Sequence, residues 1–150
     1  MRKTEIVYLD CDGTWVDLYG VENWLDDLKN KSARPYEVAK PLVNLSQLAK
    51  TIHLLQNNGI KVGVISWLAK NSNADYDNLV KEAKLKYFKK HLPSVIFDEI
   101  HIVKYGTPKS MCATSVNSVL FDDEEKNRAE WCGMAYTERN LIANMKQLVC

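Results

Sequence analysis

The sequence predicts a single α/β domain, residues 1–150, built as a three-layer α/β/α sandwich around a mainly parallel sheet. Short apolar runs alternate with amphipathic stretches of helical spacing, which is typical of such domains. Acidic or hydroxyl side chains come directly after three of these runs, as expected where parallel strands share a ligand-binding edge. The chain is long enough to bury one hydrophobic core.

The first expected element is a strand over residues 6–9, whose β-branched and aromatic side chains suit a buried central position. Residues 15–40 follow, with aromatic side chains among polar ones and no clean period. We expect them to form a flap and a short excursion over one edge of the sheet, in place of a full cap domain.

Two longer helices are predicted in the middle of the chain. The first follows Pro41, which suits a first helical turn, and stops at Gly59. The second is capped by residues 71–73 and runs to about His91. Its inward side chains are expected to be Leu79, Val80, Ala83 and Tyr87.

The remaining elements are shorter. A turn at residues 106–109 leads into a short helix, another helix runs through Trp131, and a last helix has Leu141 on its inner face. The further predicted strands cover residues 60–65, 95–97 with 100–103, 119–121 and 133–136.

The overall charge selects no partner. Lys and Arg number 20 against 19 Asp and Glu, a net charge of +1, so stable nucleic-acid binding is not implied. The four cysteines form no CxxC pair, and no apolar stretch suits a signal peptide or a membrane span. We therefore expect a reduced, cytoplasmic protein without a membrane partner. The lysines of one probable helix are expected to form a solvated face, with contact to a phosphate-rich ligand as the alternative: Lys81, Lys84, Lys86, Lys89 and Lys90.

Two predicted strands end in carboxylate pairs, Asp10 with Asp12 and Asp122 with Asp123, and a third ends in the hydroxyl of Ser66. Because the carboxyl ends of parallel strands share one edge, we expect these five side chains to converge. Gathered carboxylates stay ionised only when a cation compensates them, and oxygen ligands without Cys or His favour Mg²⁺. With Mg²⁺ and a lysine, the site would attract a phosphoryl group and place a carboxylate to attack it.

These residues resemble the motifs of the haloacid dehalogenase (HAD) superfamily. The segment at 6–14, with VYLDCDGT at its core, resembles motif I, hhhDxDGT, and Ser66 at the end of IKVGVIS resembles motif II. Lys109 in GTPKS resembles the motif III lysine, and VLFDDEEKN at 119–127 resembles motif IV. The match in order and strand placement implies a HAD-like, Rossmann-like fold of the small, near-capless phosphatase type.

The resemblance implies a role for each matched acid. Asp10 is the nucleophile that takes the phosphoryl group, and Asp12 is the general acid and then the base that activates water. Asp10, the main-chain carbonyl of Asp12 and Asp122 would hold Mg²⁺, with Asp123 bonding a metal-bound water. A carboxylate at Asp12 favours a phosphatase over a dehalogenase, and a mutase would need a cap.

Ser66 and Lys109 would bind the phosphate oxygens by the same resemblance. Lys104 is the alternative lysine, because it also follows the third strand region, but Lys109 is preferred since a Gly-Thr-Pro turn places it at the start of a helix. Asn127 is either an extra polar group near the metal or an ordinary helix residue.

We therefore expect a Mg²⁺-dependent phosphomonoester hydrolase that forms an aspartyl-phosphate and acts on a phosphorylated substrate. Trp15, Tyr19 and Trp24 of the flap, and Trp67 after Ser66, are candidates for substrate contact. Flap aromatics either stack on a nucleobase, which favours nucleotides or polynucleotide ends, or cover the core.

Two other functions use similar residues. A phosphorelay receiver domain also has clustered Asp residues, a hydroxyl and a Lys, but in a different order along the chain. A HAD-like module that binds a phosphorylated ligand such as a nucleotide signal, with slow or no turnover, would keep the same site. Recovery of intact ligand after binding would identify such a module.

Overall fold

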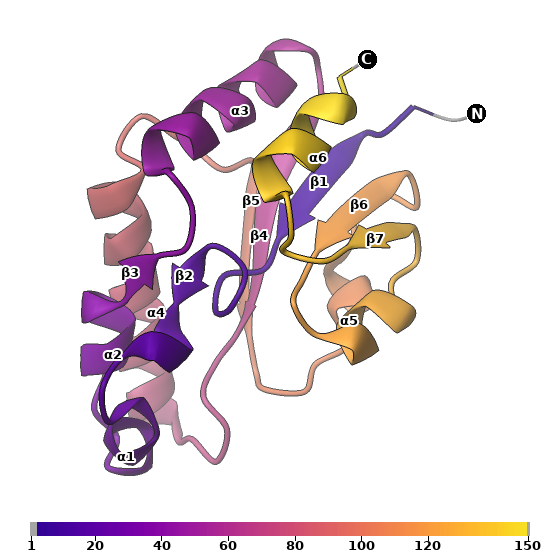
Figure 1. The fold of residues 1–150 in the computed structure, drawn as a ribbon. Helices are drawn as coiled ribbons and strands as arrows, with labels where there is room; N and C mark the ends of the chain where they lie inside the picture. The colour runs from indigo at the N-terminus through magenta and orange to yellow at the C-terminus, as the bar shows by residue number, and fades with distance from the viewer. Residues whose placement is uncertain (1–2, 150) are drawn as a thin grey trace.

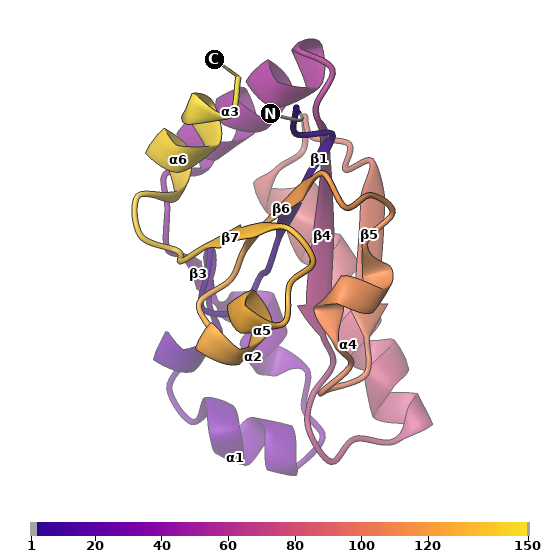
Figure 2. The same cartoon turned by 90° about the vertical axis from the view of Figure 1, so that its right-hand side faces the viewer.

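The computed structural model describes residues 3–149. Five strands form one sheet in the order β5-β4-β1-β6-β7, and each pair of neighbours is parallel (Figure 2). The strands are β1 (Ile6–Leu9), β4 (Lys61–Trp67), β5 (Glu99–Val103), β6 (Ser118–Phe121) and β7 (Met134–Tyr136). This arrangement confirms the predicted α/β class with a parallel sheet.

Helices cover the two faces of the sheet unequally. Side chains from α3 (Leu45–Asn57), α4 (Ala74–His91) and α6 (Leu141–Gln147) pack in one large hydrophobic cluster on one face. The other face carries the shorter α5 (Glu125–Ala129) and the 3₁₀ helix η2 (Lys109–Cys112), on the side turned to the viewer in Figure 2. Figure 1 shows α4 and α5 on opposite sides of the strands.

Strand β1 is buried on both faces. Val7 and Leu9 belong to the cluster with α3 and α6, while Ile6 and Tyr8 belong to the cluster on the other face, where Trp131 packs. Alternation of side chains along a strand produces this division, and two buried faces explain why the strand is apolar at every position.

The start of α3 differs from the prediction. Asn44 caps the helix, because its side chain accepts a hydrogen bond from the main-chain N–H of Gln47 at 3.0 Å. Pro41 therefore lies outside the helix, in the two-residue strand β3 (Lys40–Pro41), which pairs antiparallel with β2 (Val16–Asp17). Gly59 follows the helix in the left-handed conformation, φ +80°, as the predicted stop requires.

Helix α4 has the predicted bounds but a different inner face. Leu79 is 50% exposed, whereas Lys84 is 3% exposed. The buried stripe runs through Val80, Ala83 and Tyr87, and Lys84 lies one turn after Val80, whereas Leu79 lies beside the stripe. The solvated face predicted for the lysines is therefore wrong for Lys84. It is correct for the others, which are exposed: Lys81, Lys86, Lys89 and Lys90.

Three shorter predictions need adjustment. The predicted strand at residues 95–97 is absent from the described chain, and β5 begins at Glu99. Helix α5 ends at Ala129, before the predicted end at Trp131. Ser66 lies inside β4, because pairing with β5 continues to the end of that strand.

The expected excursion after β1 is made of short elements. Between β2 and β3 the chain forms the 3₁₀ helix η1 (Leu18–Gly20), α1 (Trp24–Lys29) and α2 (Arg34–Val38). Figure 1 shows α1 and α2 beyond the carboxyl ends of the strands, where the predicted site lies. Among residues 3–149, no helix is both long and apolar enough to cross a membrane.

Candidate active site

Asp10 and Asp122 lie side by side because β1 and β6 are paired. Leu9 is in register with Phe121, and the next main-chain N–H, that of Asp10, donates to the carbonyl of Phe121 at 2.9 Å. Both carboxylates are buried, at 6% and 0% exposure. One oxygen each from Asp10, Asp122 and Asp123 lies within 4.8 Å of the others. The structure therefore brings together these three acids from two strands, as predicted.

Lys109 joins two of these acids. Its Nζ donates to Asp10 Oδ1 at 2.6 Å and to Asp122 Oδ2 at 2.7 Å, and the residue is 3% exposed. Burial acts to lower the pKa of Lys109, but the two carboxylates outweigh it and raise that pKa above the usual lysine range, so the group is an ammonium. Lys104 is exposed and takes no part in this network.

The turn after β1 holds Asp10 from the other side. Thr14 Oγ1 donates to Asp10 Oδ2 at 2.9 Å. Gly13 has φ +87°, and a Cβ atom there would lie 2.3 Å from Asp123 Oδ2. A side chain at Gly13 would therefore strain the backbone and push Asp123 away, which gives the Gly of the DGT sequence a physical reason.

Asp122 is fixed by the start of α5. Its Oδ1 accepts from the main-chain N–H of Glu124 at 2.9 Å, and its Oδ2 accepts from Asn127 Nδ2 at 3.1 Å. Burial and the charge of Asp10 raise the pKa of Asp122. Of the two roles considered for Asn127, the structure supports the polar contact at the site, since the side chain is buried against Asp122.

Lys84 belongs to the site although it lies in no recognised motif. Its Nζ donates to Asp12 Oδ2 at 2.8 Å and to Ser66 Oγ at 2.5 Å. Ser66 is fully buried, and its hydroxyl contacts Lys84. The sequence analysis named Lys84 only as one of five lysines on a helix and missed its contacts with Asp12 and Ser66, although its position one turn after Val80 on an apolar stripe was a usable signal.

The charges of the inner site fit a divalent cation. When all four acids are ionised, four carboxylates and two ammonium groups leave an excess of two negative charges: Asp10, Asp12, Asp122 and Asp123 against Lys84 and Lys109. Burial, followed by the neighbouring Asp10 carboxylate, raises the pKa of Asp123 to about 8. Closely spaced carboxylate oxygens of this kind suit a hard cation such as Mg²⁺.

A pocket of about 510 Å³ opens above the carboxylates, and Asp10 and Asp12 are among its lining residues. Two aromatic pairs line it as well. Tyr19 packs edge-on against Trp24 with ring centroids 5.0 Å apart, and Trp67 packs against Tyr105 at 4.9 Å.

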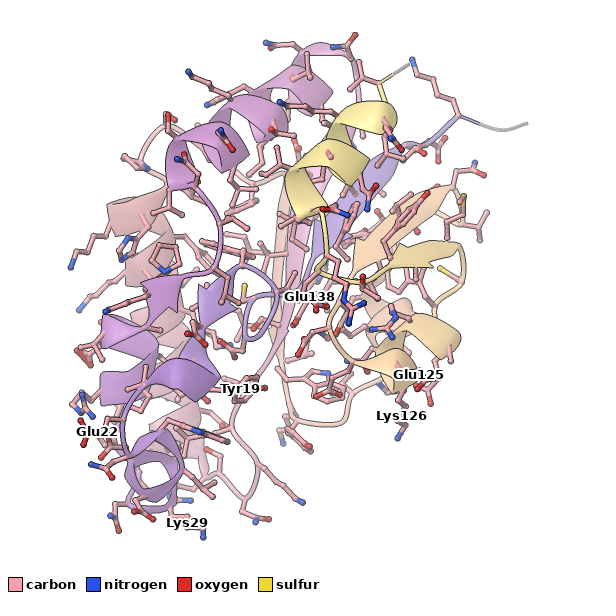
Figure 3. The ribbon with its side chains drawn as sticks, viewed as in Figure 1. Tyr19, Glu22, Lys29, Glu125, Lys126 and Glu138 are labelled. Carbon is pink, nitrogen blue, oxygen red and sulfur yellow. The ribbon has the colours of Figure 1, made fainter. Side chains whose placement is uncertain are left out.

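The two pairs come from separate segments that the fold brings to one site. Tyr19 and Trp24 belong to the excursion, whereas Trp67 ends β4 and Tyr105 lies in the loop after β5. In Figure 3 Tyr19 extends from η1 towards the side of the molecule where α5 carries Glu125 and Lys126.

Trp15 does not line this pocket. It is fully buried and packs against Tyr87 and Phe88 of α4, with ring centroids 6.0 Å and 5.7 Å away. The prediction of substrate contact is therefore wrong for Trp15, because the tight turn at Cys11 directs the indole into the core. Cys11 is itself buried in the core, as expected. The other candidates, Tyr19, Trp24 and Trp67, do line the pocket.

Comparison with solved structures identifies the fold. One similar structure is a protein from Mesorhizobium loti that is described as a HAD-like phosphatase. The TM-score is 0.56 and the identity 12%, over 99% of this chain and 88% of that chain. D,D-heptose 1,7-bisphosphate phosphatase from Burkholderia thailandensis matches with a TM-score of 0.52 and 13% identity over 95% of this chain and 74% of that chain.

The fold is HAD-like. An uncharacterized protein from Corynebacterium glutamicum shares it as well (TM-score 0.52, 10% identity, 97% and 95% of the two chains). No protein-family model and no curated protein sequence matches the chain. The HAD-like fold predicted from the four motifs is thus confirmed by three-dimensional similarity.

Proposed function

We propose that this chain is a Mg²⁺-dependent phosphomonoester hydrolase that works through an aspartyl-phosphate on Asp10. The observation that carries the proposal is the placement of Asp10. Its carboxylate is buried between Lys109 and Thr14, beside Asp122, at the floor of the pocket. A fixed carboxylate next to an ammonium suits nucleophilic attack on a phosphoryl group.

Each step of the proposed reaction has a residue to perform it. A carboxylate oxygen of Asp10 attacks phosphorus, the bond from phosphorus to the leaving oxygen breaks, and Asp12 gives that oxygen a proton. Water then attacks the aspartyl-phosphate, Asp12 takes a proton from it, and inorganic phosphate and free Asp10 are formed. The buried ammonium of Lys109 stabilises negative charge on the transferring group. Ser66 remains a predicted phosphate ligand.

Mg²⁺ would be held by Asp10, the main-chain carbonyl of Asp12 and Asp122, with Asp123 beside them. When bound, it neutralises phosphate charge and acts as a Lewis acid. The fit rests on the charge excess of the inner site and on the raised pKa of Asp123, since both are relieved by a divalent cation.

The pocket favours a substrate with a planar group and further negative charge. Its two aromatic pairs offer ring faces and edges for stacking. Three lysines also line it, and none of them lies within 4 Å of a carboxylate among the described residues: Lys29, Lys31 and Lys70. Nucleotides and polynucleotide ends combine both features. We place the activity in the cytoplasm, in agreement with three free cysteines among residues 3–149.

A phosphate-release screen tests the proposal. It compares mononucleotides, oligonucleotides with 3′ or 5′ phosphates, phosphopeptides and sugar phosphates, with and without Mg²⁺; sugar phosphates are included because one structural neighbour is a heptose bisphosphate phosphatase. We expect Mg²⁺-dependent release that is lost in Asp10→Asn. Tight binding of a nucleotide that is recovered intact would instead identify a binding module.

A further inference from the structure

Lys84 is a buried lysine that the proposed reaction does not use. It reaches the site from α4 and is 3% exposed. Its ammonium is enclosed by three side chains: Asp12 Oδ2 at 2.8 Å, Ser66 Oγ at 2.5 Å and the ring of Tyr36, whose centroid lies 5.0 Å away. An ammonium so enclosed acts on its neighbours rather than on a substrate.

Stability alone does not explain a lysine at this position. Removing an ammonium from water costs several kcal/mol, and replacing a buried ion pair by apolar side chains is often neutral or stabilising. The neighbouring positions Val80 and Tyr87 show that this stripe of α4 accepts large apolar side chains. We therefore look for the role of Lys84 in its effect on its two hydrogen-bond partners, Asp12 and Ser66.

The two bonds restrict Asp12 strongly. A lysine ammonium only donates, so Ser66 Oγ acts as an acceptor that anchors the ammonium, and Asp12 Oδ2 accepts a charge-assisted hydrogen bond from it. The Asp12 side chain is only 15% exposed, and rotating its carboxylate away would break the ion pair with Lys84. Oδ1 is thereby left as the oxygen for proton transfer in the pocket that Asp12 lines.

We propose that Lys84 is a positioning residue that fixes Asp12 for proton transfer to the leaving group, with Ser66 anchoring its ammonium. The inference rests on the proposed phosphatase function. It predicts that the importance of Lys84 depends on the leaving group, because a poor leaving group needs a well-placed proton donor and a good one does not.

The test measures kcat and KM of wild type and Lys84→Met with two substrates. One is 4-nitrophenyl phosphate, which has a good leaving group, and the other is the best alkyl phosphate of the screen, such as a nucleoside 5′-monophosphate. We expect kcat to fall about 100-fold for the alkyl phosphate and less than tenfold for 4-nitrophenyl phosphate, the range expected when general acid catalysis is impaired. KM should change little. In an Asp12→Asn background, Lys84→Met should cause little further loss.

Lys86→Met is the matched control, since Lys86 lies on the same helix with a side chain 77% exposed, and it should match wild type. If Lys84→Met does not fold, Lys84→Arg, which keeps the charge but moves the donors, should show the same unequal loss. An equal loss on both substrates in the folded variant would overturn the role of Lys84 alone. If wild type releases phosphate from neither substrate in a way that depends on Asp10, the proposed function is overturned instead.

Discussion

Two polar networks border the sheet, and they differ in the number of carboxylates that they gather. At the carboxyl edge, four carboxylates face two ammonium groups. On the sheet face that carries α5, Glu99 accepts from Tyr8 at 2.8 Å and from Thr114 at 2.7 Å, and His101 lies 2.8 Å from it. The hydrogen bonds of the second network satisfy its single carboxylate, whereas the carboxylates of the first outnumber its ammonium groups, an excess that a bound cation or protonation of Asp123 relieves.

The comparison teaches where polar groups stabilise the fold and where they serve chemistry. Hydrogen bonds lower the pKa of Glu99 even though its partial burial acts to raise it, so the folded protein favours its charge. Burial and Asp10 raise the pKa of Asp122 and of Asp123, so the fold disfavours their charge. We therefore expect changes at the edge to affect activity and changes in the Glu99 network to affect stability.

The largest effect is expected for Asp10→Asn. Loss of the nucleophile should lower phosphate release by more than about 10³-fold, because an amide does not form the aspartyl-phosphate. The free energy of unfolding, measured in urea without Mg²⁺, should not fall, since one of several repelling charges is removed. Full activity in this variant would remove Asp10 as nucleophile, and a large loss of stability would contradict the comparison.

Asp122→Asn should weaken the response to Mg²⁺. A cation that binds only the folded state raises the melting temperature, and this rise should be large in wild type and nearly absent in the variant. Activity at saturating substrate should fall about 100-fold, the order expected when a charged ligand to a catalytic metal is lost. Thermal scans over a MgCl₂ series provide the measurement. An equal Mg²⁺ shift in both proteins would place the cation elsewhere.

Ser66→Ala should have a milder effect. The variant removes the acceptor that anchors Lys84 and a predicted phosphate ligand, while all four carboxylates remain. We expect kcat to fall about tenfold, which corresponds to about 1.4 kcal/mol of transition-state stabilisation. Steady-state kinetics on the best substrate give the value. An unchanged rate would exclude Ser66 from both roles.

Glu99→Gln should lower stability and leave activity unchanged, the reverse of the result expected for the variants at the carboxyl edge. A glutamine amide keeps one acceptor oxygen, so either Tyr8 or Thr114 loses its acceptor. We expect the free energy of unfolding to fall by about 1–2 kcal/mol, with kcat unchanged. Urea unfolding and phosphate release, measured on the same preparation, test both parts. A loss of activity in a folded variant would show that the two networks are coupled.

The smallest expected effect is the pH dependence of the difference in unfolding free energy between wild type and Glu99→Gln. Because the pKa of Glu99 is lower in the folded state than its ordinary value of 4.5, its contribution is present above that value and is lost as pH falls through the folded pKa. The stability curves of wild type and Glu99→Gln should therefore converge in acid and separate towards neutral pH. A constant difference at every pH would mean that the charge of Glu99 contributes nothing.

Much of this site could be predicted from local sequence because strands carry it. Asp10 and Asp122 directly follow buried apolar runs, and pairing of parallel strands then places them together. Lys109 was predicted from its resemblance to the motif III lysine, and the Gly-Thr-Pro turn before it favoured it over Lys104. The α/β class, the parallel sheet and the position of the carboxyl edge follow from such patterns, and the resemblance to the four HAD motifs then predicted the HAD-like fold.

Side-chain direction in the helices and in the excursion could not be obtained in this way. Lys84 and Lys86 are two residues apart on one helix, yet only Lys84 meets Asp12, because the rotation of α4 against the sheet and Tyr36 decides which lysine is buried. Trp15 and Tyr19 likewise differ, since the tight turn at Cys11 directs Trp15 into the core, whereas Tyr19 lies in η1 and lines the pocket.

The sequence by itself determined the five strands of the parallel sheet, the acidic residues that follow two of them and hence the edge where chemistry is expected, because burial and alternation act between near neighbours along the chain. The tertiary structure alone decided which helix side chains reach that edge and which aromatic residues wall the pocket. Those outcomes depend on how elements distant in sequence pack, and a helix rotated by one residue would exchange a solvated lysine for a buried one.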